Sequence, residues 1–168
     1  MEVWLDGRKS IEAFASLDSG IDRILFPQYS DSTRDYFIDG NRLMNREHLI
    51  GSLVTIDSDT SQEQARSLVG SVEWLVLEFT DWSMIPIENI IAACEGTPTK
   101  IAAVITSPEQ AQGAGWALEQ GVDALIVQNS PSMVEVALIV KAQRLEHTTP
   151  KVDEVRFSAS KIGIGKLT

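Results

Sequence analysis

Two stretches of the sequence follow one plan: Ile101-Ala-Ala-Val-Ile-Thr-Ser-Pro108 and Ala124-Leu-Ile-Val-Gln-Asn-Ser-Pro131. Each begins with a short apolar run, which is typical of a strand covered on both faces. Each then reaches a serine and a proline, which favour a helix start because serine caps free N–H groups and proline lacks one. The two stretches therefore predict consecutive strand-helix units.

Apolar runs of the same kind recur along the chain, with helical segments between them. One helix is expected to start at a capping box formed by Thr60 and Glu63 and to stop at Gly70. Another has Pro86 in its first turn and ends at Gly96. Strands are expected at residues 2–5, 23–26, 53–56, 74–79, 101–105 and 124–127.

This alternation predicts an α/β fold made of βα units with a parallel sheet. A partial TIM-type barrel and a doubly wound sheet both fit, because two repeated units do not distinguish them. Residues 1–147 form the expected βα-repeat domain. Residues 148–168 are expected to be a linker, extended before Pro150, and the start of an incomplete β-rich region, with an alternating strand at 152–157. An unpaired strand there predicts self-association or pairing with a C-terminal β-rich domain.

The composition excludes several classes of protein. The chain has 168 residues, 43% of them hydrophobic and 23% charged, which suits ordinary folding by burial. A net charge of −10 argues against nucleic acids and anionic membranes as partners. The charge itself says nothing about the small-molecule substrate that is the expected partner. No apolar run approaches the roughly 18 residues of a membrane span, and no signal peptide is evident, so the expected location is cytoplasmic. The single cysteine, Cys94, is expected to be a buried, inert thiol.

Ligands of parallel sheets lie beyond the carboxyl ends of the strands. That rule nominates Asp6 and the loops at 57–59, 78–82, 106–107 and 128–130. The loop after the fourth expected strand is the most unusual, because three carboxylates and an amide gather around a tryptophan. They could hold a divalent cation or position substrate hydroxyls. The residues are Glu78, Asp81, Trp82, Glu88 and Asn89.

A structural explanation of the same residues stays open. Asp81 can cap the following helix, Glu88 can favour its dipole and Trp82 can belong to the core. Likewise, Thr106, Ser107, Asn129 and Ser130 at two helix starts suit either a phosphosugar ligand or plain capping. No metal ligands at characteristic spacing and no dinucleotide-binding glycine motif occur, so the residues by themselves predict no metal site.

The stretch Thr80-Asp-Trp-Ser-Met-Ile-Pro-Ile-Glu-Asn-Ile-Ile-Ala92 resembles the signature of type II 3-dehydroquinate synthases. The similarity continues through residues 100–104 and 118–124, and it extends weakly to residues 2–4 and 155–165. The resemblance implies an enzyme, or its N-terminal half, that oxidatively deaminates 2-amino-3,7-dideoxy-D-threo-hept-6-ulosonate with NAD and closes the ring to 3-dehydroquinate. A related branch makes 3-amino-4-hydroxybenzoate by condensing carbonyl compounds and is associated with a divalent metal.

The resemblance also implies roles for particular residues. Asp81, Glu88 and Asn89 would orient the substrate, Glu78 or Asp81 would accept a proton, and Lys100 would be a further cationic group. Two departures favour a second hypothesis, a non-catalytic binding or regulatory paralogue. Family members are longer and carry basic and histidine-containing motifs in their C-terminal half. They also often have lysine where this chain has Ser83, and lysine is the natural Schiff-base residue.

Overall fold

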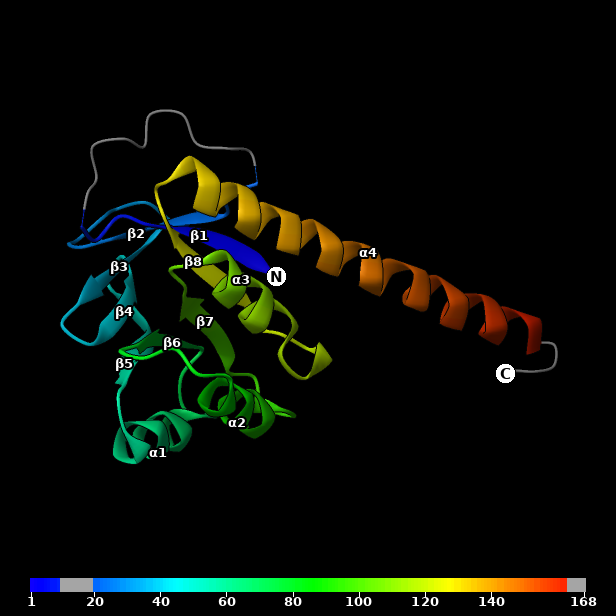
Figure 1. The fold of residues 1–168 in the computed structure, drawn as a ribbon, viewed down its shortest axis with the longest axis horizontal. Helices are drawn as coiled ribbons and strands as arrows, with labels where there is room; N and C mark the ends of the chain where they lie inside the picture. Colours follow the sequence, from blue (N-terminus) through cyan, green and yellow to red (C-terminus); the bar gives the residue numbers. More distant parts are fainter. Residues whose placement is uncertain (10–19, 163–168) are drawn as a thin grey trace.

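The structure is a computed structural model that describes the backbone of residues 1–9 and 20–162 and the side chains of residues 1–9 and 20–147. In that part of the chain, eight strands follow one another around a closed barrel, and β1 pairs with β8 to close it (Figure 1). The strands are β1 (Glu2–Asp6), β2 (Arg23–Phe26), β3 (Tyr36–Asp39), β4 (Arg42–Asn45), β5 (His48–Ile56), β6 (Trp74–Phe79), β7 (Lys100–Val104) and β8 (Ala124–Gln128).

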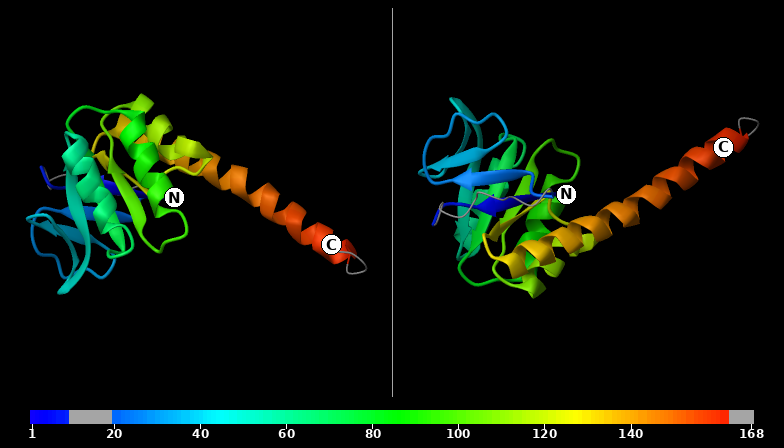
Figure 2. Two further views of the ribbon diagram at one scale, coloured as in Figure 1. Left: turned by 90° about the horizontal axis from the view of Figure 1, so that it is seen from below. Right: turned by 90° about the horizontal axis from the view of Figure 1, so that it is seen from above.

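Helices follow each of the last four strands. They are α1 (Asp59–Leu68), α2 (Met84–Cys94), α3 (Pro108–Trp116) and α4 (Pro131–Ile162), with a short 3-10 helix, η1 (Ala117–Glu119), after α3. They contact the β5, β8 and β1 side of the barrel, and Figure 2 shows α4 projecting from it. Every helix in the described residues is too short or too polar to cross a membrane.

The expected parallel α/β sheet, whether a partial TIM-type barrel or a doubly wound sheet, is wrong. Strand β4 runs antiparallel to both β3 and β5, so the closed barrel is mixed. The cause is a hairpin in which Asp39 pairs with Arg42 across a two-residue loop. Gly40 begins that loop with a φ of +65°, a conformation that glycine adopts without strain. The hairpin reverses the chain without a helix and places a strand of opposite direction in the ring.

The β-rich region expected after residue 147 is also wrong within the described residues. Helix α4 continues through Ile162, in place of the linker at Pro150 and the strand at 152–157. The alternation of Val155 and Phe157 suggested a strand, whereas Val152 and Val155 are three positions apart, a spacing that fits a helix and would place them on opposite faces of a strand. Residues 163–168 lie outside the described residues, and a domain boundary at 147 stays a prediction.

The six predicted strands are confirmed. Five of them match to within one residue at each end, whereas β5 begins at His48, five residues before the expected start, and β3 and β4 were not predicted. Helix starts are confirmed in part. The capping box of α1 joins Ser58 to Ser61, two residues before the expected pair. Ser107 caps α3 ahead of Pro108, as predicted. Both Gly70 and Gly96 adopt positive φ after their helices.

Two apolar clusters hold the fold together. One lies between the barrel and the helices, and the other fills the inside of the barrel. At the centre of the inner cluster the Trp4 ring meets the rings of Trp74 and Tyr36 edge-on, with centroids 4.7 and 5.2 Å apart. The barrel interior is therefore packed with side chains, and any ligand site must lie at one of its ends.

Cys94 at the end of α2 is buried, as predicted. Burial, with a smaller effect of Asp123, raises the pKa of its thiol from 9.0 to about 11. Because the thiolate is the reactive form, we expect alkylation by iodoacetamide at pH 8 to be about 100-fold slower in the folded chain than in urea. The fold holds this proton more tightly than the unfolded chain does, so its stability should fall as the pH rises from 9 toward 11. Equal alkylation rates in the two states would contradict this assignment.

Candidate functional site

A cavity of about 330 Å³ opens at the carboxyl end of the barrel. It lies where β1, β6, β7 and β8 end, and its size falls within the range of small-molecule sites. Six of the eight described residues that line it have polar or charged side chains. The lining residues are Asp6, Lys9, Glu78, Val104, Ile105, Thr106, Gln128 and Asn129.

Strand register explains why polar groups meet there. Side chains alternate between the two faces of a strand, so residues two positions apart point the same way. Trp4 and Ile126 belong to the inner cluster and are partners in register. Asp6 and Gln128 follow two positions later and are partners in turn. The packed side chains inside the barrel therefore form the floor of the cavity. The next layer of inward-pointing side chains, which forms the cavity wall, contains polar residues.

Arg8 joins two carboxylates of this cavity. Its Nε and Nη2 donate to Oδ1 and Oδ2 of Asp6 at 2.9 Å each. Its Nη1 and Nη2 also donate to Oε1 and Oε2 of Glu78 at 3.2 and 3.0 Å. The hydrogen bond to Asp6 and, more weakly, that to Glu78 raise the pKa of Arg8 above its ordinary value, against the opposing effect of burial. Arg8 is therefore a permanent cation between two anions.

Backbone contacts fix the position of this guanidinium. The amide of Gly7 donates to the carbonyl of Leu25 on β2 at 2.8 Å. The amide of Arg8 donates to Oδ1 of Asp6 at 3.1 Å, which closes a tight turn directly after β1. The side chains of Asp6 and Arg8 are only 11% and 15% exposed, whereas that of Glu78 is 32% exposed. Glu78 is consequently the carboxylate more open to a ligand.

Replacing Arg8 by Met is expected to lower the free energy of unfolding by about 2 kcal/mol, because it leaves two largely buried carboxylates without their shared cation. Urea unfolding measures the change. Arg42→Met is the matched control, because Arg42 pairs with Asp39 at 2.9 Å with both side chains more than half exposed. Its loss should stay below about 1 kcal/mol. Equal losses in the two variants would show that the Arg8 bridge is an ordinary surface contact.

Five of the residues nominated from the sequence line this cavity: Asp6, Glu78, Thr106, Gln128 and Asn129. The other two polar residues of the helix starts have local partners. The Ser107 hydroxyl accepts from the amide of Gln110 at 3.2 Å and so caps α3. The hydroxyl of Ser130 lies 3.1 Å from that of Ser132.

The signature segment lies outside the cavity wall. Asp81 is exposed, and Glu88 is half-buried on α2. Asn89, also exposed, donates to the side chain of Gln62 on α1 at 2.9 Å. The Trp82 ring packs edge-on against Phe79 with centroids 5.1 Å apart. Among the described residues no three Asp, Glu, His or Cys side chains are placed to hold a metal ion.

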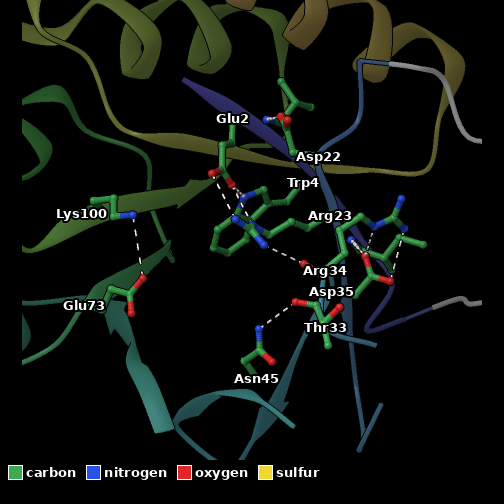
Figure 3. Close-up of polar contacts among 12 residues, drawn as sticks. Glu2, Trp4, Asp22, Arg23, Thr33, Arg34, Asp35, Asn45, Glu73 and Lys100 are labelled. Carbon is green, nitrogen blue, oxygen red and sulfur yellow. Dashed lines mark hydrogen bonds and ion pairs between the residues drawn. The ribbon is translucent and has the colours of Figure 1, made fainter. Parts of the chain in front are cut away.

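Lys100 lies at the opposite end of the barrel. It is the first residue of β7, four residues and about 13 Å from the strand end that borders the cavity. Its Nζ is 3.9 Å from Oε2 of Glu73 and 4.8 Å from the centre of the Trp74 ring. Figure 3 shows it on the side of Glu2 and Arg23, which form their own ion pair at 2.9 Å. The structure therefore does not bring Lys100 together with Glu78.

Arg8 and Lys9 were not singled out from the sequence, although they belong to this end of the barrel. The sequence did contain a signal for both residues. Directly after the first expected strand comes the run Asp6-Gly7-Arg8-Lys9, and the strand-end rule had already nominated Asp6 from it.

The matches to known proteins all identify the same family. The family described as 3-dehydroquinate synthase II N-terminal domain matches residues 2–142. A 3-dehydroquinate synthase of Methanocorpusculum labreanum is 30% identical over 128 residues, which are 73% of this chain and 37% of that protein. The 3-dehydroquinate synthase of Methanothrix thermoacetophila is 37% identical over 87 residues, 51% of this chain and 24% of that protein. No solved structure matches.

The matched part of the chain thus spans little more than a third of the length of the first relative. The family match nevertheless takes in most of the chain, from the first residue of β1 into α4. The chain belongs to the 3-dehydroquinate synthase II family, whose N-terminal domain it matches.

Proposed function

We propose that this chain binds 2-amino-3,7-dideoxy-D-threo-hept-6-ulosonate at the carboxyl end of its barrel and takes part in converting it to 3-dehydroquinate. The proposed conversion is an oxidative deamination with NAD followed by ring closure. The names of the relatives support the product. The observation that carries the proposal for this chain is the cavity in which Asp6 and Glu78 face Thr106 and Gln128.

The chemistry of this ligand suits the cavity wall. It carries an ammonium group, a carboxylate, hydroxyls and a methyl ketone. A carboxylate has about four lone-pair positions, so Glu78 can accept from a ligand while it holds Arg8. Glu78 would bind the ammonium group and take a proton from it. Thr106 and Gln128 would bind hydroxyls, and Lys9 would lie near the polar end groups.

The described residues do not fit NAD. A volume of about 330 Å³ suits a seven-carbon acid, and a dinucleotide is several times larger. Two of the lining residues are carboxylates, which repel a pyrophosphate, and no glycine-rich turn follows a strand in this part of the chain. We therefore assign no step to NAD here. We propose that it is held by parts of the family's longer proteins that this chain does not match.

The experiment is a pair of measurements on the chain as it exists. Calorimetric titration with the amino-ulosonate should show one site, and titration with NAD should show none. The absence of any binding heat with the amino-ulosonate would overturn the proposal. Binding of NAD, with release of ammonium and formation of NADH when both compounds are present, would contradict the assignment of NAD to other parts of the longer proteins.

A further inference from the structure

We propose that Lys9 is a carbonyl-reactive amine, which forms an imine with the methyl ketone of the ligand and so prepares the ring closure. This inference rests on the proposed function and adds a reacting group to it. Lys9 was not among the residues that the sequence nominated. Two observations support this role of Lys9: the position of its side chain in the cavity, and the ion pairs that the neighbouring Arg8 forms.

Lys9 is the lysine that lines the cavity at the carboxyl end of the barrel. Among described residues, Lys141 is held by Asp22 at 2.8 Å and by the carbonyl of Gly20 at 2.9 Å. Lys100 lies near Glu73 at the other end. An amine that must attack a ligand has to reach it, and Lys9 meets that requirement.

Lys9 is also without a partner among the residues that the structure describes, because no hydrogen bond or ion pair of its side chain occurs there. The neighbouring Arg8 forms the ion pairs with Asp6 and Glu78, and neither carboxylate forms one with Lys9. The turn that fixes the Arg8 backbone to Asp6 also fixes where the next residue begins. The amine is exposed and sits beside two acids that can relay protons.

The imine steps themselves need no oxidant. Glu78 takes a proton from the ammonium form of Lys9, and the free amine then adds to the ketone carbon and forms a C–N bond. Glu78 returns the proton, and the carbonyl oxygen leaves as water. The resulting iminium makes the adjacent methyl group acidic, so Glu78 takes one methyl proton and leaves an enamine, the carbon nucleophile that ring closure needs. The enamine attacks the carbonyl carbon that the oxidative deamination with NAD has produced, and the oxygen of that carbonyl takes up the proton held by Glu78. Water then hydrolyses the iminium and returns Lys9.

The test traps the imine with borohydride. The probe is 3-dehydroquinate, which keeps the ketone. The chain is treated with the probe and sodium borohydride, digested and analysed by mass spectrometry. The peptide that contains Lys9 should gain the mass of the ketone less one oxygen atom. Lys9→Arg should lose the adduct, and the matched control Lys100→Arg should keep it. An adduct on another lysine, or none, would overturn the proposal.

Calorimetry on the same samples separates this proposal from the proposed function. Binding by the parent chain without trapping by borohydride overturns the role of Lys9 and leaves the proposed function standing. Loss of both binding and trapping overturns both.

Discussion

Replacing Glu78 by Gln is expected to weaken binding of the amino-ulosonate by about 10- to 100-fold, because the ammonium group loses a charge-assisted hydrogen bond. Glu78 is the more open carboxylate of the cavity, and Gln keeps its size. The affinity is measured by calorimetry. A circular dichroism spectrum checks that the fold survives, since the variant also loses part of the ion pair with Arg8.

Asp81→Asn is the matched control for this change. Both substitutions turn a carboxylate into an amide within one short stretch of the chain, but Asp81 is exposed and outside the cavity wall. Its affinity should match that of the parent chain. A larger loss in Asp81→Asn than in Glu78→Gln would move the site to the signature segment and contradict the location argued here.

Replacing Trp4 by Ala is expected to cost about 3–5 kcal/mol in the free energy of unfolding, since it empties the middle of a packed barrel. Trp4 is fully buried, and its ring meets those of Tyr36 and Trp74. Its Nε1 also donates to Oε1 of Glu2 at 2.6 Å. Such a loss is a large share of the total stability of a domain, so urea unfolding should show a much earlier midpoint.

Trp116→Ala serves as the control for the loss of a large ring. Trp116 is half-buried on the outer layer, where it meets the ring of His147 edge-on with centroids 5.4 Å apart. The expected loss is about 1 kcal/mol. If both variants lost the same amount, the interior of the barrel would not be the core described here.

Continuous apolar runs, which are typical of strands covered on both faces, predicted strands such as β7 and β8. The prediction missed β3 and β4, where each strand has only four residues and polar ones at its ends. The hairpin had a sequence signal of its own, Asp39-Gly40, which was overlooked. The error in fold class follows from β4, because the turns at Gly40-Asn41 and Arg46-Glu47 make it antiparallel to both of its neighbours.

For the site, the strand-end rule worked where the residue directly follows a strand interior, as with Glu78, Thr106 and Asn129. It failed for the signature segment because α2 begins there. The positions Ile87, Ile90 and Ile91 are buried, so the helix period leaves Glu88 and Asn89 less buried and outside the cavity wall. Patterns in the sequence had placed these polar residues at the mouth of a strand.

The position of Lys100 and the contact between Arg8 and Glu78 differ in how far the sequence could predict them. Lys100 could have been placed correctly, because it stands at the start of a strand and therefore at the opposite end of the barrel. The bridge from Arg8 to Glu78 joins residues 70 positions apart. No local pattern predicts such a contact, because it exists only once the barrel has brought β1 and β6 to the same end.

The central claim is that the ligand binds at the carboxyl end of the barrel. Its most direct test is a nuclear magnetic resonance titration of the ¹⁵N-labelled chain with the amino-ulosonate, read residue by residue. We predict that the largest amide shifts will fall on Gly7, Thr106 and Gln128. Shifts centred on Glu88 and Asn89, or on Lys100 at the far end, would contradict the claim.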